Sequence, residues 1–518
     1  MRKLTCLLIV FILVVCMTVM AACTESGDNN SSSEAASADN SSTVSDNTDE
    51  SSTDDTSEPD IVIKDFGGAE FIVLTIGGTD SISEILPNTL TEDSKSWLTL
   101  AVNEAIAERN NQTESLLNVK IKERKVDSGR VGGQMLTYIR QEIAGSDHTF
   151  DVCAPSIYDC GTLAAEGNFW NLKEIPSLNT ENEWWDQSFN DSMTINNCLY
   201  FTLGDIGITN KNATPVVYFN KSLAENNGID AADLYQLVRD GKWTFDKAYE
   251  YAKKLSMDTD DNGTIDYNDL VGWAGQADDT WNFFFASGER IVSAKADGTL
   301  ELSMYNSRSV DVAEKMYTMF RDNNHYISAN DYFKDSNTPT YDCTGKAFIE
   351  GRVLFFSDNM AFMHYFAAMD DDFGVLPTPK YNEEQNSYFS LINPWTGNAF
   401  AIPTTLTEEE AYFAGAVLDV MGYYSVKTIA FEYEQRTLKY QKARDEDSID
   451  MLQLIFNTRG CDIGIIYNIG SSSGTSLPIM LQDLMKSASG AFTSSYEAIA
   501  DAAQLDLDKV IAAYGIEN

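Results

Sequence analysis

Short apolar runs alternate with longer amphipathic stretches in the first third of the sequence. Three of these runs have the length and composition of buried strands, at residues 71–75, 119–121 and 150–154. Two stretches between them place apolar residues at helical spacing, at 98–117 and 134–144. This β-α-β-α-β order predicts a mostly parallel sheet covered by helices. Because ligands bind such sheets beyond the carboxyl ends of the strands, the loop expected at 156–159 is a candidate site, with Tyr158 and Asp159.

The later part of the sequence is richer in helices. Thr407 and Glu410 form a capping box that opens an apolar helix extending to about Tyr423. Two further helices are expected, at about 445–456 and 494–514. Domains commonly contain roughly 100–200 residues, so a chain of 518 residues is expected to form two or more lobes.

The charge of the chain excludes several functions. Lys and Arg total 36 against 79 Asp and Glu, which gives a formal net charge of −43. Such a surface repels phosphate backbones, so we expect no nucleic-acid partner. The sequence has 3 histidines, which limits His-based catalysis and His-rich metal sites. A single long apolar run is present, which excludes a polytopic membrane protein.

The N-terminal residues have the features of a secretory signal. Arg2 and Lys3 precede an almost wholly apolar run from Leu7 to Met20, shorter than the about 20 residues that a membrane span needs. The run ends in the letters MAAC at Cys23, which resemble a bacterial lipobox. We therefore expect residues 1–22 to be a lipoprotein signal peptide and Cys23 to carry the lipid, palmitate included. Ordinary signal cleavage and a retained N-terminal anchor are the alternatives.

A polar segment at 23–60 follows the signal and is predicted to be a disordered tether. Residues 24–60 include 11 Ser and 11 acidic residues, with no Lys or Arg. Almost nothing in this composition offsets the entropy lost on ordering, and the like charges extend the segment. It would connect a membrane anchor with the folded body.

An acidic segment at 258–269 matches the EF-hand pattern at most of its ligand positions. Calcium takes about six to eight oxygen ligands, which alternate residues of a tight loop can supply. We expect a structural Ca²⁺ site, because one such loop is present; an acidic surface turn without metal is the alternative. A shorter acid stands at the last position, as in dockerin-type loops. The predicted ligands are Asp258, Asp260, Asn262, Thr264 through its carbonyl, Asp266 and Asp269.

A series of short motifs follows in order along the body of the chain. They lie at 151–152 with 161–167, and at 199–201, 217–223, 241–247, 348–351, 373–380 and 443–452. Their order over about residues 68–515 resembles extracellular solute-binding proteins of bacterial ABC importers. This family includes the maltose- and oligosaccharide-binding proteins.

The resemblance implies an α/β fold of the periplasmic-binding-protein-like type II class, in which two α/β lobes joined by a hinge hold ligand in an interlobe cleft. Carried onto this sequence, lobe 1 would contain 61–205 and 376–425. Lobe 2 would contain 206–375 and 426–518. The lobes would close on the ligand and release it unchanged to a permease.

We therefore expect a monomeric, lipid-anchored protein on the extracellular face of the cell membrane that is not an enzyme. Its partners would be a carbohydrate, with an oligosaccharide the expected solute, and the transmembrane permease subunits of an ABC transporter. A surface-tethered carbohydrate-active enzyme and a sensor or adhesin with the same fold are the alternatives. A GxSxG motif at 470–474 gives the enzyme weak support, because the hydrolase order needs a His after Ser472 and none follows.

A carbohydrate site combines flat aromatic rings with Asp, Asn or Gln, because sugars present C–H faces and hydroxyl rims. By the order of segments in the maltose-binding relatives, Trp281 falls where the family places a sugar-facing aromatic, and Asn359 lies near another such platform. Trp395 lies on a segment that returns to the hinge, and Asp205 at the expected crossover. The predicted ligand-binding residues are Tyr158, Asp159, Asp205, Trp281, Asn359 and Trp395.

Most of the other tryptophans are expected to pack in the core. This applies to Trp170, Trp243 and Trp273. Trp184 and Trp185 are adjacent and cannot both face inward on one strand, so one of the two is a candidate for the rim of the cleft.

Overall fold

A computed structural model of the chain describes residues 60–77, 83–89, 100–295, 298–440, 446–486 and 491–516, without the side chains of 367–368 and 436–440. The predicted signal peptide 1–22, the lipidated Cys23 and all of the tether except Asp60 lie outside the described residues. Among the described helices, none has the length and apolar character needed to cross a membrane.

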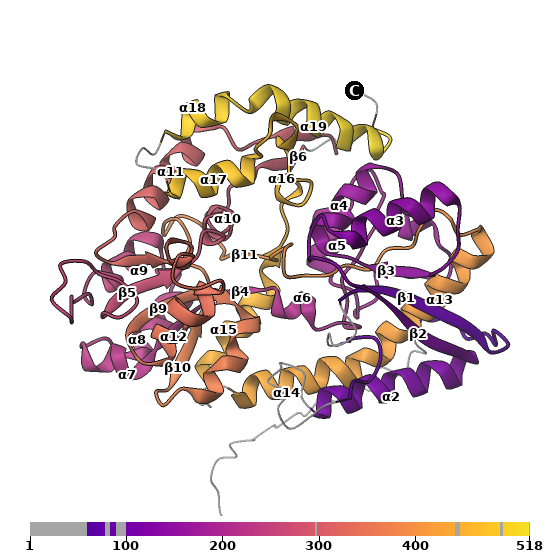
Figure 1. Cartoon of the computed structure of the whole chain (residues 1–518), viewed down its shortest axis with the longest axis horizontal. Coiled ribbons are helices and arrows are strands. Elements are labelled where there is room, and N and C mark those ends of the chain that lie inside the picture. Colours follow the sequence, from indigo (N-terminus) through magenta and orange to yellow (C-terminus); the bar gives the residue numbers. More distant parts are fainter. Residues whose placement is uncertain are drawn as a thin grey trace, which may run out of the picture. The chain divides into compact units, whose positions relative to one another are not determined.

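The first sheet has three strands, and β1 pairs in parallel with both neighbours. In spatial order they are β2 (Val119–Val126), β1 (Ala69–Ile76) and β3 (Val152–Ala154). Two helices connect them in sequence, α2 (Leu100–Leu117) and α3 (Gln134–Gly145), and both lie beside the sheet in Figure 1. The β-α-β-α-β prediction is therefore confirmed. Phe71, Val73 and Leu74 of β1 are fully buried, as expected for a strand covered on both faces.

The prediction of a loop at 156–159 was wrong, because these residues form the start of a helix, α4 (Ile157–Ala165). The Ser156 hydroxyl accepts a hydrogen bond from the backbone N–H of Asp159 at 3.2 Å. A serine at this position satisfies one of the N–H groups that a helix start leaves unpaired. Asp159 is therefore held within the first turn of α4, where it is 2% exposed.

The second sheet is mixed, with spatial order β10-β4-β9-β5-β8. The strands are β4 (Pro215–Asn220), β5 (Val271–Gly275), β8 (Tyr326–Ser328), β9 (Val353–Asn359) and β10 (Phe373–Leu376). β5 pairs in parallel with β8 and β9, whereas β4 runs antiparallel to β9 and β10. All residues of β4 and β9 are buried, which explains their nearly continuous apolar sequences.

Shorter helices and strands make up the connections between and beyond the two sheets. The helices are α5 (Gln187–Met193), α6 (Thr209–Asn212), α7 (Lys221–Asn226), α8 (Ala231–Arg239), α9 (Phe245–Ala252), α10 (Asp279–Ala286), α11 (Ser307–Phe320) and α12 (Lys346–Ile349). The remaining strands are β6 (Val292–Ala294), β7 (Leu300–Leu302), β11 (Ser390–Leu391) and β12 (Arg459–Gly460). The predicted core tryptophans Trp243 and Trp273 are 0% and 3% exposed, and Trp273 lies on β5.

The chain returns from the second sheet to the first through a segment that contains β11. The indole of Trp243 donates to the carbonyl of Pro377 at 2.9 Å, so this segment begins against the second sheet's helices. The first bridge to the side of the first sheet joins Asn398 to Ser156. Residues 376–425, which the family resemblance placed in lobe 1, thus begin with contacts to the second sheet.

The C-terminal part is helical. It consists of α13 (Glu408–Ser425), α14 (Phe431–Tyr440), α15 (Glu446–Asn457), α16 (Ile463–Ile466), α17 (Leu477–Lys486), α18 (Phe492–Glu497) and α19 (Ala500–Ala513). The predicted capping box of Thr407 and Glu410 is formed, and the helix expected at 445–456 corresponds to α15. The prediction of a single helix at 494–514 was wrong. The structure has two helices there, α18 and α19, and Ile499 is buried in the turn between them.

Candidate ligand-binding cleft

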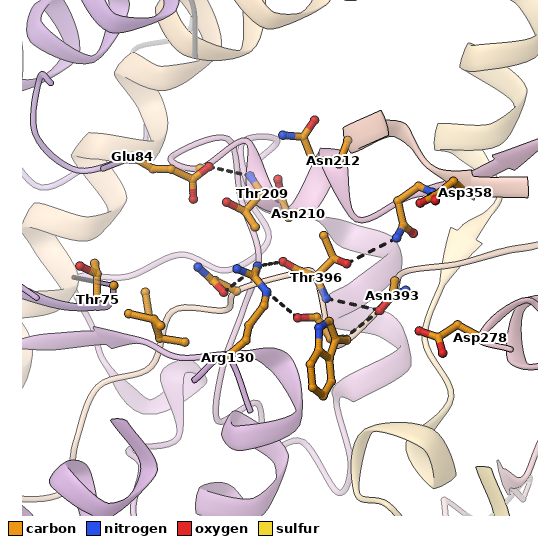
Figure 2. Close-up of a pocket in the computed structure, with 18 of the residues that line it drawn as sticks. Thr75, Glu84, Arg130, Thr209, Asn210, Asn212, Asp278, Asp358, Asn393 and Thr396 are labelled. Atoms are coloured by element: carbon orange, nitrogen blue, oxygen red, sulfur yellow. Dashed lines mark hydrogen bonds between the residues drawn. The ribbon is translucent and has the colours of Figure 1, made fainter. Parts of the chain in front are cut away.

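A cleft of about 910 Å³ is lined by residues of both sheets and of the segments that join them. Thr75 and Ile76 of β1 and Ala154 of β3 reach it from the carboxyl ends of the first sheet. Asp358 and Asn359 reach it from the end of β9. This placement follows the rule that ligands of α/β sheets bind beyond the carboxyl ends of the strands. Figure 2 shows Thr75 and Glu84 at one end of the pocket and Asp278 and Asp358 at the other.

Three exposed aromatic rings line the cleft. The side chains of Phe333, Tyr341 and Trp395 are 59%, 46% and 50% exposed, although large apolar groups are usually covered. Tyr341 is backed by Phe362, whose ring stacks on it at 5.3 Å between centroids. Exposed rings held by the packing behind them provide flat surfaces for a ligand. Phe333 and Tyr341 were not among the predicted site residues.

Trp281 also lines the cleft, but it is fixed by its surroundings. It lies on α10 and is 5% exposed, and its indole N–H donates to the carbonyl of Pro478 at 2.7 Å. The ring of Tyr158 packs edge-on against it, with 6.3 Å between the centroids. Tyr158 therefore supports Trp281 and is not itself part of the described lining.

Arg130 connects the first sheet to the crossover that carries Trp395. It follows β2 and donates from Nε to the carbonyl of Trp395 at 2.7 Å, and from Nη2 to the carbonyl of Thr396 (Figure 2). Asn393 fixes the same turn, because its Oδ1 accepts from the backbone N–H of Trp395 at 2.9 Å. Among the described lining residues, Arg130 is the one basic side chain. The exposed ring of Trp395 thus projects from a hydrogen-bonded segment.

Glu84 holds a second crossover at the other end of the cleft. One carboxylate oxygen accepts from the backbone N–H groups of Ile208 and Thr209, each at 2.6 Å. Behind it, the buried guanidinium of Arg109 donates to the carbonyls of Ile85 and Ile206 at 2.8 and 2.9 Å. Burial raises the pKa of Glu84 and lowers the pKa of Arg109 to about 9. These contacts position the segment that leads into α6, which begins at Thr209.

Two carboxylates stand at the end of the cleft formed by the second sheet. Asp358 is 9% exposed, and its Oδ1 accepts from the backbone N–H of Asn359 at 2.6 Å. Asp278 begins α10 and accepts from the side-chain amide of Gln482 at 2.9 Å. Burial, reinforced by the nearby charge of Asp278, raises the pKa of Asp358 to about 7.

The structure places three of the six predicted ligand residues in the lining of the cleft and three outside it. Trp281, Asn359 and Trp395 line it, and the side-chain amide of Asn359 donates to Thr396 Oγ1 at 3.4 Å. Asp159 accepts from the backbone N–H of Gly132 at 2.9 Å, which ties α4 to the loop after β2.

Asp205 lies in a second depression of about 700 Å³ and pairs with Lys211, with 3.0 Å between Oδ1 and Nζ. Sequence reasoning missed the carboxylates Glu84, Asp278 and Asp358 as well as Arg130. The signal for Asp358 was present, because this acid lies two residues after the apolar run 353–356, within the same strand β9. Glu84 and Arg130 have no comparable local pattern.

The candidate rim tryptophans are buried away from the cleft. Trp184 and Trp185 are 5% and 2% exposed, and neither lines the cleft, so the placement of one of them at its rim was wrong. Both indole N–H groups donate to the same oxygen of Asp419 on α13, at 2.8 and 2.9 Å. A shared buried acceptor accounts for why two neighbouring indoles face the same way.

The predicted calcium loop brings three carboxylates together. Ligand oxygens of Asp258, Asp260 and Asp269 all lie within 4.8 Å of one another. Gly263 has φ of +86°, a conformation that favours glycine, and its N–H donates to Asp258 at 2.7 Å. Asp269 is buried and accepts from the backbone N–H of Thr259 at 2.7 Å. The chemistry of this donor set, three convergent carboxylates, fits a hard divalent cation.

The surroundings of the GxSxG motif differ from those of a hydrolase elbow. The apolar run before it forms the short helix α16 where that elbow has a strand, and the backbone N–H of Ser472 donates to Asp506 at 3.0 Å. His364 donates from Nδ1 to the carbonyl of Ala361, and His148 and His325 contact carboxylates. No histidine or cysteine belongs to the described lining of the cleft.

Comparisons with solved structures identify the fold. The cyclic α-maltosyl-1,6-maltose binding protein of Arthrobacter globiformis matches with a TM-score of 0.54 and 11% identity, over 86% of this chain and 99% of that one. UgpB of Mycobacterium tuberculosis, solved with glycerophosphocholine, matches with a TM-score of 0.53 and 15% identity over 86% and 99%. The ABC substrate-binding protein Lmo0181 of Listeria monocytogenes, solved with cycloalternan, has a TM-score of 0.52 and 13% identity over 87% and 100%.

No protein-family model matches the sequence, and no curated protein matches it. The chain nevertheless has the fold of ABC-transporter solute-binding proteins, a two-lobed α/β fold of the periplasmic-binding-protein-like type II class. The fold class expected from the sequence is therefore confirmed.

Proposed function

We propose that this protein captures a carbohydrate in its cleft and delivers it unchanged to the permease of an ABC importer. The observation that carries the proposal is the lining of the cleft, where exposed rings of Phe333, Tyr341 and Trp395 stand among carboxylate and amide side chains. Rings suit the C–H faces of sugars, and polar side chains suit their hydroxyl rims. The volume of about 910 Å³ accommodates an oligosaccharide.

The mechanism of ligand capture follows from the two-lobed fold. A sugar that contacts Trp395 and Tyr341 together with the residues of the first sheet is better bound when the lobes approach each other. A ligand shifts an equilibrium between open and closed forms by its difference in affinity for the two. The closed form would then be the one that docks on the permease, and no bond of the ligand is broken.

The binding experiment is a calorimetric titration of the purified full chain with mono-, di- and oligosaccharides. Trp395→Ala should weaken binding by about tenfold or more, because stacking area is lost on an exposed ring. Tyr305→Ala is the matched control, since Tyr305 is 44% exposed and stacks on Tyr496 outside the cleft. Equal affinities of the two variants and the unaltered protein would reject the site. Recovery of a chemically altered sugar would instead favour an enzyme.

The location that we propose is the extracellular face of the cell membrane, with the lipid on Cys23 and the acidic segment 23–60 as tether. The support is the sequence of the N-terminal region together with a body whose fold serves uptake in the solved relatives. Labelling cells with radioactive palmitate should mark the unaltered protein and not Cys23→Ser. A labelled Cys23→Ser variant would overturn the anchor.

We also propose that loop 258–269 binds Ca²⁺ as a structural ion. Asp258, Asp260 and Asp269 supply convergent carboxylates, and the predicted ligands Asn262, Thr264 and Asp266 lie in the same loop. Ile265 of this loop packs against the apolar cluster around β9. A bound ion would offset the repulsion among the acids and hold this residue in place.

A further inference from the structure

One carboxylate oxygen in the cleft lacks a partner that a buried acid normally has. Asp358 is 9% exposed and its Oδ1 accepts from the N–H of Asn359, whereas its Oδ2 has no hydrogen-bond partner among the residues that the structure describes. A buried polar group without a partner is costly, so native proteins seldom keep one without a reason. Because Asp358 lines the cleft, a ligand can supply the missing donor.

The second carboxylate at this end, Asp278, makes the local charge more negative. Figure 2 shows it at the same end of the pocket as Asp358, where it is partly satisfied by Gln482. Hydrogen bonds from neutral amides leave its charge in place. Two carboxylates that share one region of low dielectric repel each other, and either a proton on one of them or a cation between them relieves this repulsion.

No basic side chain faces Asp358 among the described residues. The titratable groups that face Asp358 come from β4, from the start of α10 and from the segments around residues 341 and 365. They are Tyr218, Asp278, Asp279, Tyr341 and Tyr365. Arg130 is engaged with the carbonyls of Trp395 and Thr396 and interacts with Glu84. Lys486 of α17 interacts electrostatically with Asp278, but it does not belong to the described lining. The described lining of the acidic end therefore has no basic side chain of its own.

Two kinds of ligand group can meet this arrangement. A neutral sugar hydroxyl can donate to Asp358 Oδ2, but it brings no positive charge to Asp358. A protonated amine donates hydrogen bonds and also brings a positive charge, which makes these bonds charge-assisted. The exposed ring of Tyr341, which interacts electrostatically with Asp358, offers a face to the same cation.

We propose that the solute is a sugar that carries a protonated amino group, and that Asp358 and Asp278 bind this group. The inference rests on the proposed function, because it assigns the substrate class of the same cleft. Phe333, Tyr341 and Trp395 would contact the faces of the sugar rings, while the acidic end selects the amine over a hydroxyl or an acetamide. An acetylated amine keeps the shape of the substituent but loses its charge.

The test compares sugars that differ at one substituent. The purified full chain is titrated calorimetrically, at about pH 7, with glucosamine, galactosamine and the glucosamine disaccharide chitobiose in its free-amine form. Each is paired with its N-acetylated form and with its hydroxyl counterpart, namely glucose, galactose and cellobiose. We expect an amino sugar to bind about tenfold or more tightly than both of its partners, because a charge-assisted hydrogen bond is worth at least that factor.

Variants then assign the preference to the carboxylates. Asp358→Asn keeps the acceptor for the N–H of Asn359 and removes the charge, so the ratio of amine to hydroxyl-sugar affinity should fall to about twofold or less. Asp278→Asn should reduce the preference in the same direction. Asp246→Asn is the matched control, because this exposed acid on α9 pairs with Lys315 outside the cleft.

The outcomes separate the inference from the proposed function. Equal affinity for amino and hydroxyl sugars, or a preference that survives Asp358→Asn, overturns the inference while carbohydrate capture stands. If no sugar of either kind binds, carbohydrate capture itself fails and the inference fails with it. Binding of free ethylamine as tightly as the amino sugars would also overturn it, because the rings would then contribute nothing.

Discussion

The guanidinium of Arg130 donates from Nε to the backbone carbonyl of Trp395, with 2.7 Å between the two atoms, although 265 residues separate them in the chain. Arg130 follows a strand of the first sheet, whereas Trp395 belongs to the crossover between the sheets. Further donation to Thr396 and to Asn398, the latter at 3.4 Å, fixes three residues of that crossover to one side chain. The orientation of the exposed Trp395 ring thus depends on Arg130, which follows β2 of the first sheet.

Replacing Arg130 should therefore weaken ligand binding through Trp395. In Arg130→Met the alkyl chain remains, but the donors to the carbonyls of Trp395 and Thr396 are lost. We expect affinity to fall by about tenfold, since hydrogen bonds to charged groups contribute roughly 1.5–3 kcal/mol. Calorimetric titration with the best-binding sugar measures this. Arg140→Met is the control, because Arg140 on α3 pairs with Glu166 away from the cleft; equal losses in both variants would contradict the prediction.

The raised pKa of Asp358 makes stability depend on pH. The folded protein holds the proton up to a pKa of about 7, whereas an unfolded Asp releases it near the ordinary pKa of 3.8. The folded state therefore binds more protons in this window, and stability present below about pH 4 is lost as pH rises through about 7. The loss is at most about 4 kcal/mol.

Asp358→Asn should remove this part of the pH dependence, because an amide does not titrate. Urea unfolding of both proteins without ligand, at about pH 5 and about pH 8, measures the difference. The free energy of unfolding should fall more steeply with pH in the unaltered protein than in the variant. Parallel pH profiles would show that Asp358 does not titrate in this range.

Asp419 should be essential to stability because it serves two indoles at once. In Asp419→Ala the N–H groups of Trp184 and Trp185 lose their acceptor inside the core, at a cost of about 1–3 kcal/mol each. Asp419→Asn keeps an acceptor oxygen and should cost less. Urea unfolding of the three proteins tests this order, and an alanine variant as stable as the asparagine variant would refute it.

Calcium should stabilise the protein through loop 258–269. Adding Ca²⁺ should raise the melting temperature, and Asp258→Ala should abolish both this rise and the heat of binding. Asp261→Asn is the control, since Asp261 lies in the same loop between the predicted ligands and is absent from the convergent carboxylates. A variant Asp258→Ala that responds to Ca²⁺ like the unaltered protein would place the ion elsewhere.

The first sheet could be predicted from the sequence because its signals are local. The alternation of short apolar runs with helical periodicity between residues 71 and 154 is present in β1, α2, β2, α3 and β3. The capping box of Thr407 and Glu410 is equally local. The break between α18 and α19 could not be predicted from the sequence, because the helical spacing of apolar residues continues through it. In the structure, Ile499 is buried at this break.

The candidate site was only partly predictable. Trp281 was predicted because the family resemblance places a sugar-facing aromatic there, and Trp395 because it lies on the segment that returns to the hinge; both line the cleft. Asp205 was expected there because of its place in the chain, but in the structure it pairs with Lys211, which lies six residues further along. Which acid has a nearby base, and which has none, is decided by how the segments pack.

The residues themselves determined the order of strands and helices, the acidic character of the surface and the pattern of the calcium loop, since each depends on neighbours a few positions away. Only the tertiary structure decided that Asp278 and Asp358 line the same end of the cleft, and that Arg130 holds the segment of Trp395. Burial and electrostatic environment are properties of packed segments that lie far apart in the chain, and no local pattern encodes them.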